Sequence, residues 1–233
     1  MTLKLVYCGA ANSGKTTNLM ALHASAGAEA CGRLMTLETG DDRTFFFDLL
    51  PQAIPSKDGP LRLRIKLFAV PGQAINGATR KLVLQGADGV AFVADSRRSE
   101  TENNAAAFLD LCENLKANGT AIGKVPLVIQ FNKRDLPDVR GDDELGEIAA
   151  RGREPVFTAV AARGEGVLET FLGLLHLTWV TLDVSADLAG RLGISGDDLL
   201  TSVARQLKAR ASIDSLLAKS MGGSFRPLEH LFP

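Results

Sequence analysis

The chain has 233 residues, of which 45% are hydrophobic and 23% are charged, proportions that suit one globular domain with an appendage. Its formal net charge of −1 excludes the basic electrostatic footprint of a nucleic-acid-binding protein. Three scattered cysteines, Cys8, Cys31 and Cys112, lack the spacing of a disulfide or zinc framework and indicate a reducing compartment.

The first residues of the chain predict a strand that leads into a phosphate-binding loop. An apolar run at residues 3–7 precedes the pattern G-x-x-x-x-G-K-T over residues 9–16, and a helix-like segment follows over residues 17–26. Glycines let the backbone curl so that successive N–H groups point at phosphate oxygens. Lys15 is expected to reach the outer phosphates, and the Thr16 hydroxyl is expected to ligate Mg²⁺. The residues predicted to hold the phosphates are Gly9, Asn12, Ser13, Gly14, Lys15, Thr16 and Thr17.

Strand-like and helix-like segments alternate along the rest of the first 184 residues. Residues 44–50 and 61–67 are joined by a region rich in proline and glycine, which predicts an antiparallel pair at a sheet edge. Continuous apolar runs at residues 89–94 and 126–131 are typical of parallel strands buried on both faces. The remaining predicted elements are a strand over residues 155–160 and helices over residues 102–118, 143–150 and 167–184. Together these elements predict a three-layer α/β/α fold of the P-loop type, with a mixed, mostly parallel sheet of six strands.

The composition changes near residues 183–185, so we divide the chain into a domain over residues 1–184 and a helical C-terminal extension over residues 185–233. In the extension, four apolar residues follow helical spacing, and Ser212 is predicted to cap a second, shorter helix. We expect the extension to pack at least partly on the first domain. The alternatives are that it replaces a regulator in cis or docks a partner. The four apolar residues are Leu199, Leu200, Val203 and Leu207.

The sequence contains no recognisable targeting signal. A strand begins within two residues of Met1, which leaves no room for a signal peptide. No apolar stretch approaches the ~18 residues that a membrane span needs. Thr2 excludes myristoylation, and Leu231-Phe232-Pro233 is not a prenylation box. We expect a cytoplasmic protein with no stable membrane anchor.

Three further motifs follow predicted strands, at the sheet edge where α/β proteins bind ligands. They are Val70-Pro71-Gly72-Gln73, Asn132-Lys133-Arg134-Asp135 and Ala159-Val160-Ala161-Ala162. Each motif is weak by itself, but their order behind a phosphate-binding loop is specific. The four motifs therefore predict a single nucleotide site.

The order of these motifs resembles that of the Ras-like small GTPases, and the fuller pattern resembles their bacterial MglA group, which controls gliding motility and cell polarity. The resemblance covers about residues 3–182 and leaves the extension unexplained. It implies the small-GTPase fold, bound GTP or GDP with Mg²⁺, a roadblock-type activator, and polarity or motility effectors. The matching segments are Gly14-Lys15-Thr16-Thr17-Asn18-Leu19, Asp42-Arg43-Thr44-Phe45-Phe46-Phe47-Asp48, Val70-Pro71-Gly72-Gln73, Arg80-Lys81-Leu82, Asp88-Gly89-Val90, Val93-Ala94-Asp95-Ser96 and Asn132-Lys133-Arg134-Asp135-Leu136-Pro137.

The resemblance implies a guanine-specific pocket. Asp135 would accept hydrogen bonds from guanine N1 and N2, and adenine would leave this carboxylate unpaired. Asn132 would brace the loop, while Lys133 would lie along the base and ribose. The backbone N–H of Ala161 would reach guanine O6, with Ala162 beside it in the same loop.

The resemblance also implies the residues of GTP hydrolysis. Thr44 would close on Mg²⁺ and the γ-phosphate, the Gly72 N–H would contact the γ-phosphate, and Gln73 would orient the attacking water. Lys15 and Arg43, the latter supplied in cis, would stabilise charge on the transferring phosphoryl group.

Two positions depart from the usual Ras-like pattern. Ala69 replaces the Asp of D-x-x-G, as is common in the MglA-like group, and predicts weaker retention of Mg²⁺. Ala11 replaces a glycine close to the γ-phosphate, so we expect slow intrinsic hydrolysis without an activator. Both departures also suit an alternative, a GTP- or GDP-binding scaffold module with little or no hydrolysis. A nucleotide kinase is a second alternative, but the sequence lacks an arginine-rich lid segment.

Overall fold

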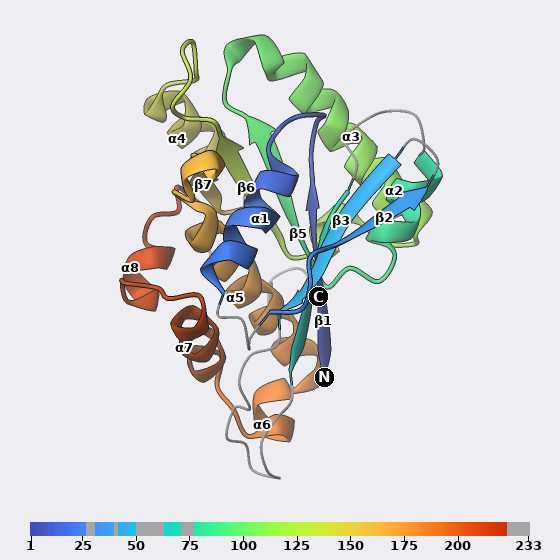
Figure 1. Ribbon diagram of the computed structural model, residues 1–233, viewed down its shortest axis with the longest axis vertical. Coiled ribbons are helices and arrows are strands. Elements are labelled where there is room, and N and C mark those ends of the chain that lie inside the picture. Colours follow the sequence, from blue (N-terminus) through green and yellow to red (C-terminus); the bar gives the residue numbers. More distant parts are fainter. Residues whose placement is uncertain (27–30, 40–41, 50–62, 71–76, 223–233) are drawn as a thin grey trace.

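The computed structural model describes residues 1–26, 31–39, 42–49, 63–70 and 77–222, with only the backbone described for residues 37–39 and 42–45. One seven-stranded sheet has the order β2-β3-β4-β1-β5-β6-β7 (Figure 1). The β2–β3 and β3–β4 pairs are antiparallel, and all other neighbouring strands are parallel. The predicted α/β fold with a mixed, mostly parallel sheet is confirmed. The strands are β1 (Thr2–Cys8), β2 (Met35–Thr39), β3 (Asp42–Leu49), β4 (Arg64–Ala69), β5 (Gly89–Asp95), β6 (Leu127–Asn132) and β7 (Val156–Thr158).

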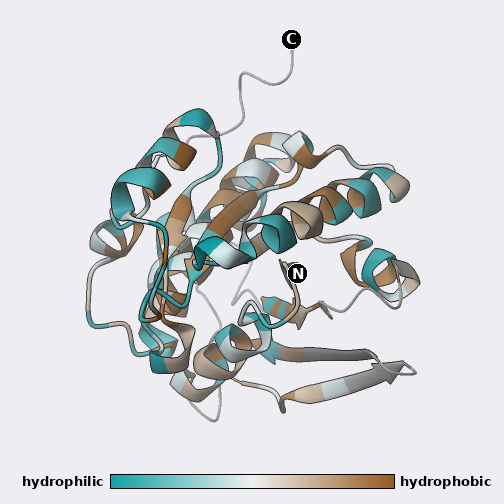
Figure 2. Ribbon diagram, turned by 90° about the horizontal axis from the view of Figure 1, so that it is seen from above, coloured by the Kyte–Doolittle hydropathy of each residue, from teal (hydrophilic) through white to brown (hydrophobic). Residues whose placement is uncertain are grey.

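The sheet is covered on both faces, and the side-chain alternation of β1 shows how. Leu3, Leu5 and Tyr7 are buried with the helices α1 and α5, while Val6 and Cys8 are buried with α2, α3 and α4. Figure 2 shows hydrophobic colour along the central strands and mixed colour along the surrounding helices. The result is a three-layer arrangement. The helices are α1 (Lys15–Ser25), α2 (Gly77–Leu84), α3 (Thr101–Ala117), α4 (Asp142–Arg151) and α5 (Val167–Ala186).

The sequence-based prediction of six strands is wrong by one, because it lacks β2. This strand pairs only with β3 in the described sheet, at an edge where Met35 and Thr36 are exposed. An edge strand does not need a continuous apolar run, so its sequence signal is weak. The short helix α2 is also absent from the predicted elements. The strand expected over residues 155–160 is limited to Val156–Thr158.

Helix α5 corrects the expectation that no segment is apolar enough to span a membrane. It has 20 residues and a mean hydropathy of 1.4 over its most apolar part, so it passes that test by length and composition. Among the described residues it is the one helix that does so. Most of this part, 61%, is buried against the sheet and the extension, and burial of this kind accounts for the apolar composition of a core helix.

The C-terminal extension packs on α5 by an apolar face. Leu199, Leu200 and Val203 are each 0% exposed and belong to the same hydrophobic cluster as Phe171 and Trp179 of α5. Figure 1 shows the last helices lying beside α5, on the side away from the sheet. The boundary placed at residues 184/185 falls within the last turn of α5. The helices of the extension are α6 (Leu188–Leu192), α7 (Gly196–Gln206) and α8 (Ile213–Leu217).

Two further contacts bring the chain after α8 back to the first domain. Met221 pairs with Val156 of β7 through two backbone hydrogen bonds of 2.7 and 3.1 Å. Lys219 Nζ lies 2.6 Å from Glu169 Oε1, and Glu169 is only 9% exposed on α5. The described end of the chain thus lies against the β7 edge of the sheet.

Candidate nucleotide-binding site

The phosphate-binding loop lies between β1 and α1, and two of its glycines have backbone conformations that other residues rarely adopt. Gly9 has φ +137°, and a Cβ there would lie 2.1 Å from the carbonyl oxygen of Val93. Gly14 has φ +102°, and a Cβ there would lie 2.0 Å from Asn132 Nδ2. The loop therefore packs closely against the ends of β5 and β6 only because both positions lack a side chain.

The loop presents its N–H groups at the start of α1. Within the described part of the chain, the backbone N–H groups of Gly14, Lys15 and Thr16 donate to no backbone acceptor. Ser13 Oγ is buried and likewise has no hydrogen-bond partner there. A helix N-terminus with unpaired N–H groups and a partial positive charge favours a bound anion. This arrangement suits phosphate.

Lys15 carries a buried positive charge in the same loop. Its side chain is 6% exposed, and Nζ donates to the carbonyl oxygens of Ala10 at 2.5 Å and Gly9 at 3.1 Å. Burial lowers the pKa of Lys15 to about 8, and the nearby charges of Arg80 and Lys133 act in the same direction. A bound phosphate group would raise the pKa of Lys15 again, because it supplies a negative charge that the two carbonyl groups lack.

Asn132 joins the phosphate-binding loop to the loop after β7. Its Nδ2 donates to the Ser13 carbonyl at 2.8 Å, and its Oδ1 accepts from the backbone N–H of Ala161 at 2.9 Å. The Ala161 N–H, which is expected to reach guanine O6, is thus bonded to Asn132 in this structure. Ala162, the next residue, is exposed, and its N–H donates to no backbone acceptor among the described residues.

Lys133 and Asp135 follow the carboxyl end of β6, which lies at Asn132. Lys133 adopts φ +66°, and its Nζ forms an ion pair of 2.7 Å with Asp95 Oδ2. The side chain of Asp135 is about a quarter exposed, and its carboxylate lies 3.6 Å from the guanidinium of Arg163. The tetrad residues Asn132, Lys133 and Asp135 and the Ala161/Ala162 loop are thus gathered at the carboxyl ends of β6 and β7.

Asp95 is a site residue to which the sequence analysis assigned no role. It is 3% exposed at the end of β5 and accepts hydrogen bonds from Lys133 and from the side chain and backbone of Arg97. Burial opposes ionisation of Asp95, but the hydrogen bonds from Arg97 and Lys133 outweigh it and lower the pKa to about 2. Its signal in the sequence was a polar side chain directly after a buried apolar run, the same signal that identified Asn132.

The residues expected to act on the γ-phosphate are only partly described. Gly72 and Gln73 lie outside the described residues. Arg43 and Thr44 lie in β3, where their backbones pair with Glu38 and Leu37 of β2. Both residues are therefore part of a paired strand in this structure.

The described residues suit Mg²⁺ bound mainly through phosphate oxygens. Thr16 stands in the first turn of α1, and no cluster of three or more His, Cys, Asp or Glu side chains occurs in the described part of the chain. Ala69 is the last residue of β4 and is 2% exposed. Its methyl group stands where D-x-x-G proteins have a carboxylate. Mg²⁺ commonly takes one or two protein ligands and completes its shell with substrate phosphates and water.

No family model matches the chain. The mutual gliding-motility protein MglA of Myxococcus xanthus (strain DK1622) is 41% identical over 179 residues, which are 77% of this chain and 91% of the relative. The chain belongs to the MglA family. Membership of this family of small Ras-like GTPases agrees with the fold and with the motif order, and the match leaves part of this chain uncovered.

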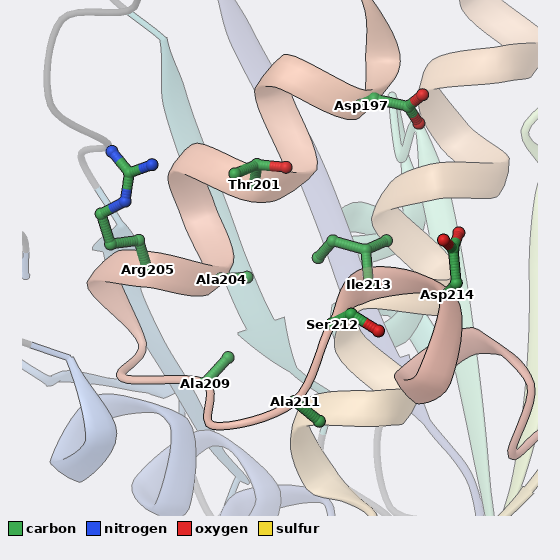
Figure 3. A pocket seen from close by; sticks show the side chains of 9 residues that line it. All are labelled: Asp197, Thr201, Ala204, Arg205, Ala209, Ala211, Ser212, Ile213 and Asp214. Carbon is green, nitrogen blue, oxygen red and sulfur yellow. The ribbon is translucent and has the colours of Figure 1, made fainter.

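The extension contains a cavity of its own, of about 540 Å³, between α7 and α8. Figure 3 shows Asp197, Thr201 and Arg205 along α7, with Ser212 and Asp214 across from them at the start of α8. None of the predicted nucleotide-binding residues lines it. The cavity is therefore separate from the MglA-type site.

Proposed function

We propose that the protein is a GTP/GDP switch that binds GTP with Mg²⁺ and hydrolyses it slowly to GDP and phosphate. The observation that carries this proposal is the bridge made by Asn132, which holds the phosphate-binding loop and the Ala161 loop to one side chain at 2.8 and 2.9 Å. A phosphate site and a base site fixed to each other in this way fit the two ends of a single nucleotide.

Selection of guanine would come from Asp135. A carboxylate accepts the N1–H and N2–H donors of guanine, whereas adenine offers no donor pair in that arrangement and leaves the carboxylate desolvated. Lys133 would lie along the base, and its ammonium group is held by Asp95. The exposed Ala162 N–H is the donor best suited to guanine O6, in place of the Ala161 N–H.

The phosphates would bind at the start of α1. The N–H groups of Gly14, Lys15 and Thr16 would donate to phosphate oxygens, and Lys15 Nζ would exchange its carbonyl partners for the β- and γ-phosphates. Bound Mg²⁺ would supply a positive charge that offsets the negative charge developing on the β- and γ-phosphates. Thr16, together with Thr44 when its strand moves toward the phosphates, would hold it.

Hydrolysis would proceed by attack of a water oxygen on the γ-phosphorus as the bond to the β–γ bridging oxygen breaks. Lys15 would stabilise the charge that develops on the transferring group and on the leaving GDP. Gln73 would orient the water, and Arg43 would add a second positive charge after leaving its position in β3. Because Arg43 and Thr44 have to leave a paired strand, we infer that the intrinsic rate is low.

The cellular role that we propose is regulation of polarity or motility by a cytoplasmic protein. The name of the relative refers to gliding motility, and family membership extends this role to the chain as a proposal. A roadblock-type activator and polarity or motility effectors would be the partners. Such an activator would act by bringing Arg43, Thr44 and Gln73 to the γ-phosphate.

Single-turnover hydrolysis tests the proposal. The purified protein is loaded with GTP and Mg²⁺, excess nucleotide is removed, and bound GTP and GDP are followed over time. Slow conversion to GDP that Gln73→Ala abolishes is the expected result. Bound GTP that stays intact even with a roadblock-type partner would favour the binding-module alternative, and failure to retain any guanine nucleotide would overturn the proposal.

A further inference from the structure

Three buried polar side chains form a network beneath the nucleotide loops. Asn18 of α1, Gln130 of β6 and Thr170 of α5 are each 0% exposed. They come from three elements that are far apart in sequence, since Asn18 and Gln130 are 112 positions apart and Gln130 and Thr170 are 40 positions apart. The network fills a position between α1, α5 and the sheet where apolar side chains would otherwise pack.

Each member of the network is paired. Asn18 Nδ2 donates to Gln130 Oε1 at 2.8 Å, and Gln130 Nε2 donates back to Asn18 Oδ1 at 2.9 Å. Gln130 Nε2 also donates to Thr170 Oγ1 at 2.8 Å. A buried amide without partners costs free energy, so an arrangement with reciprocal bonds fixes the separation and orientation of the elements that carry it.

The outer bonds of the network end on the backbone of the nucleotide loops. Asn18 Nδ2 donates to the Gly14 carbonyl at 3.0 Å, inside the phosphate-binding loop. Thr170 Oγ1 donates to the Gly166 carbonyl at 2.7 Å, next to the loop that contains Ala161 and Ala162. Gln130 itself lies two residues before Asn132 in the same strand. The network therefore contacts the phosphate side and the base side of the site, and Asn132 joins the same two sides through a separate pair of bonds.

We propose that Asn18, Gln130 and Thr170 act as positioning residues that hold the phosphate-binding loop at the distance from the base loops that one guanine nucleotide requires. None of the three contacts the nucleotide in this proposal. Their effect is on how well a ligand can occupy both halves of the site at once, and so on how long GDP or GTP stays bound. This inference rests on the proposed nucleotide binding.

Helix α5 offers a matched pair of variants. Thr170 and Thr178 are both 0% exposed, and each donates its hydroxyl to the carbonyl four residues before it at 2.7 Å. Of the two, only Thr170 accepts a bond from Gln130. Thr170→Val removes the network bond and Thr178→Val removes a hydroxyl of the same kind elsewhere on the helix, so the difference between them isolates the network. Thr170→Ser keeps the hydroxyl and serves as the rescue variant.

The first readout is dissociation of a fluorescent GDP analogue from the full chain. Thr170→Val is expected to raise the dissociation rate about 3- to 10-fold, the factor for one buried hydrogen bond. Thr178→Val and Thr170→Ser are expected to remain within about 2-fold of the starting protein. Asn18→Ala, which removes bonds to both Gln130 and Gly14, is expected to exceed Thr170→Val and is the second test if that variant does not fold.

The second readout is pyrophosphate, which occupies the phosphate loop without the base loops. A positioning role predicts that Thr170→Val weakens pyrophosphate binding less than it weakens GDP binding. Competition against the GDP analogue measures the affinity for pyrophosphate. Equal losses for pyrophosphate and GDP, equal effects of Thr170→Val and Thr178→Val, or an unchanged GDP dissociation rate would each overturn the proposal. Failure of the unmodified protein to bind GDP would instead overturn the proposed function.

Discussion

Two glutamines show how the nucleotide edge of the sheet, meaning the carboxyl ends of β1, β5, β6 and β7, differs from the C-terminal extension. Gln130 lies at the nucleotide edge, and its amide oxygen and nitrogen are both hydrogen-bonded to named side chains. Gln206 ends α7 in the extension, and neither of its buried amide atoms has a partner among the described residues. Gln130 is buried with both amide atoms paired, whereas Gln206 lies in an extension whose contact with α5 is mainly apolar.

This difference separates two kinds of effect. Directional bonds fix relative positions, so their loss should change ligand binding. Apolar burial is roughly proportional to area and has no preferred direction, so its loss should change stability alone. Substitutions in the two regions therefore distinguish the two kinds of effect.

The largest effect is expected from Lys15→Ala at the nucleotide edge. Removing one partner of a buried charged contact typically costs 2–5 kcal/mol, so GDP affinity should fall by about 30-fold to several thousand-fold. The thermal stability of the nucleotide-free protein should not fall, because a desolvated ammonium group is removed. Titration with a fluorescent GDP analogue and nucleotide-free melting measure the two quantities. Unchanged affinity would place the phosphates elsewhere.

Leu200→Ala should produce the opposite pattern in the extension. Leu200 is 0% exposed, and truncation of a buried leucine costs about 2–5 kcal/mol of unfolding free energy. We expect a lower denaturation midpoint in urea and an unchanged GDP dissociation rate at 25 °C. The exposed neighbour Thr201 provides the control variant Thr201→Ala, which should change neither. Faster GDP release in Leu200→Ala alone would show that the extension acts on the site.

Asp95→Asn tests the support of Lys133. The folded pKa of Asp95, about 2, lies below the unfolded value of about 3.9, so its ionised form contributes about 2 kcal/mol above pH 4. This contribution is lost as the pH falls through 2. The variant should lose about 2 kcal/mol at pH 7, with a smaller loss near pH 2, and should release GDP faster. Urea denaturation at both pH values gives the comparison, and an equal loss at both would contradict the assigned pairing.

Gln206→Leu tests the unpaired amide. Replacing an unpaired buried amide by an apolar group should raise the unfolding free energy, by about 1 kcal/mol. Gln130→Leu should instead lower it, because Asn18 and Thr170 lose their partner. Urea denaturation of the two variants measures both changes in unfolding free energy. The contrast between the two regions fails if both substitutions change stability in the same direction.

The smallest effect is a proton taken up with the nucleotide. Lys15 has a folded pKa of about 8, below the ordinary value of about 10.4, so it is partly neutral at pH 8.5 in the free protein. Bound phosphate raises this pKa, which means that GDP binding takes up protons at pH 8.5 and weakens as the pH rises further. Calorimetry in buffers of different ionisation enthalpy should detect this uptake at pH 8.5, and the Lys15-dependent part of the proton exchange should vanish at pH 6.5. Lys15→Ala removes the uptake if Lys15 is its source.

The sequence predicted those parts of the site that are local in the chain. The residues of the phosphate-binding loop and the Asn132 to Asp135 tetrad stand in short motifs, so their spacing alone brought them together. Asn18 and Gln130 are single amides 112 residues apart, and nothing in either local sequence indicates that they pair. The use of the Ala161 N–H by Asn132 was missed for the same reason, since it depends on how closely two loops approach.

The fold was predictable where burial dictates composition. The parallel strands β5 and β6 are buried on both faces and read as continuous apolar runs. β2 was not predicted, because an edge strand does not need a continuous apolar run. The pairing of Met221 with Val156 was also not predictable, since it joins a strand to a single residue of the extension through backbone atoms that no side chain encodes.

That pairing has a consequence for self-association. An open sheet has two edges, and stacking sheets edge to edge into a fibre requires both to be free. Here Met221 occupies the β7 edge with two backbone hydrogen bonds, while β2 ends the described sheet on the other side. Another strand could pair with Val156 only after the extension releases Met221, so the extension hinders edge-to-edge stacking on this side of the sheet.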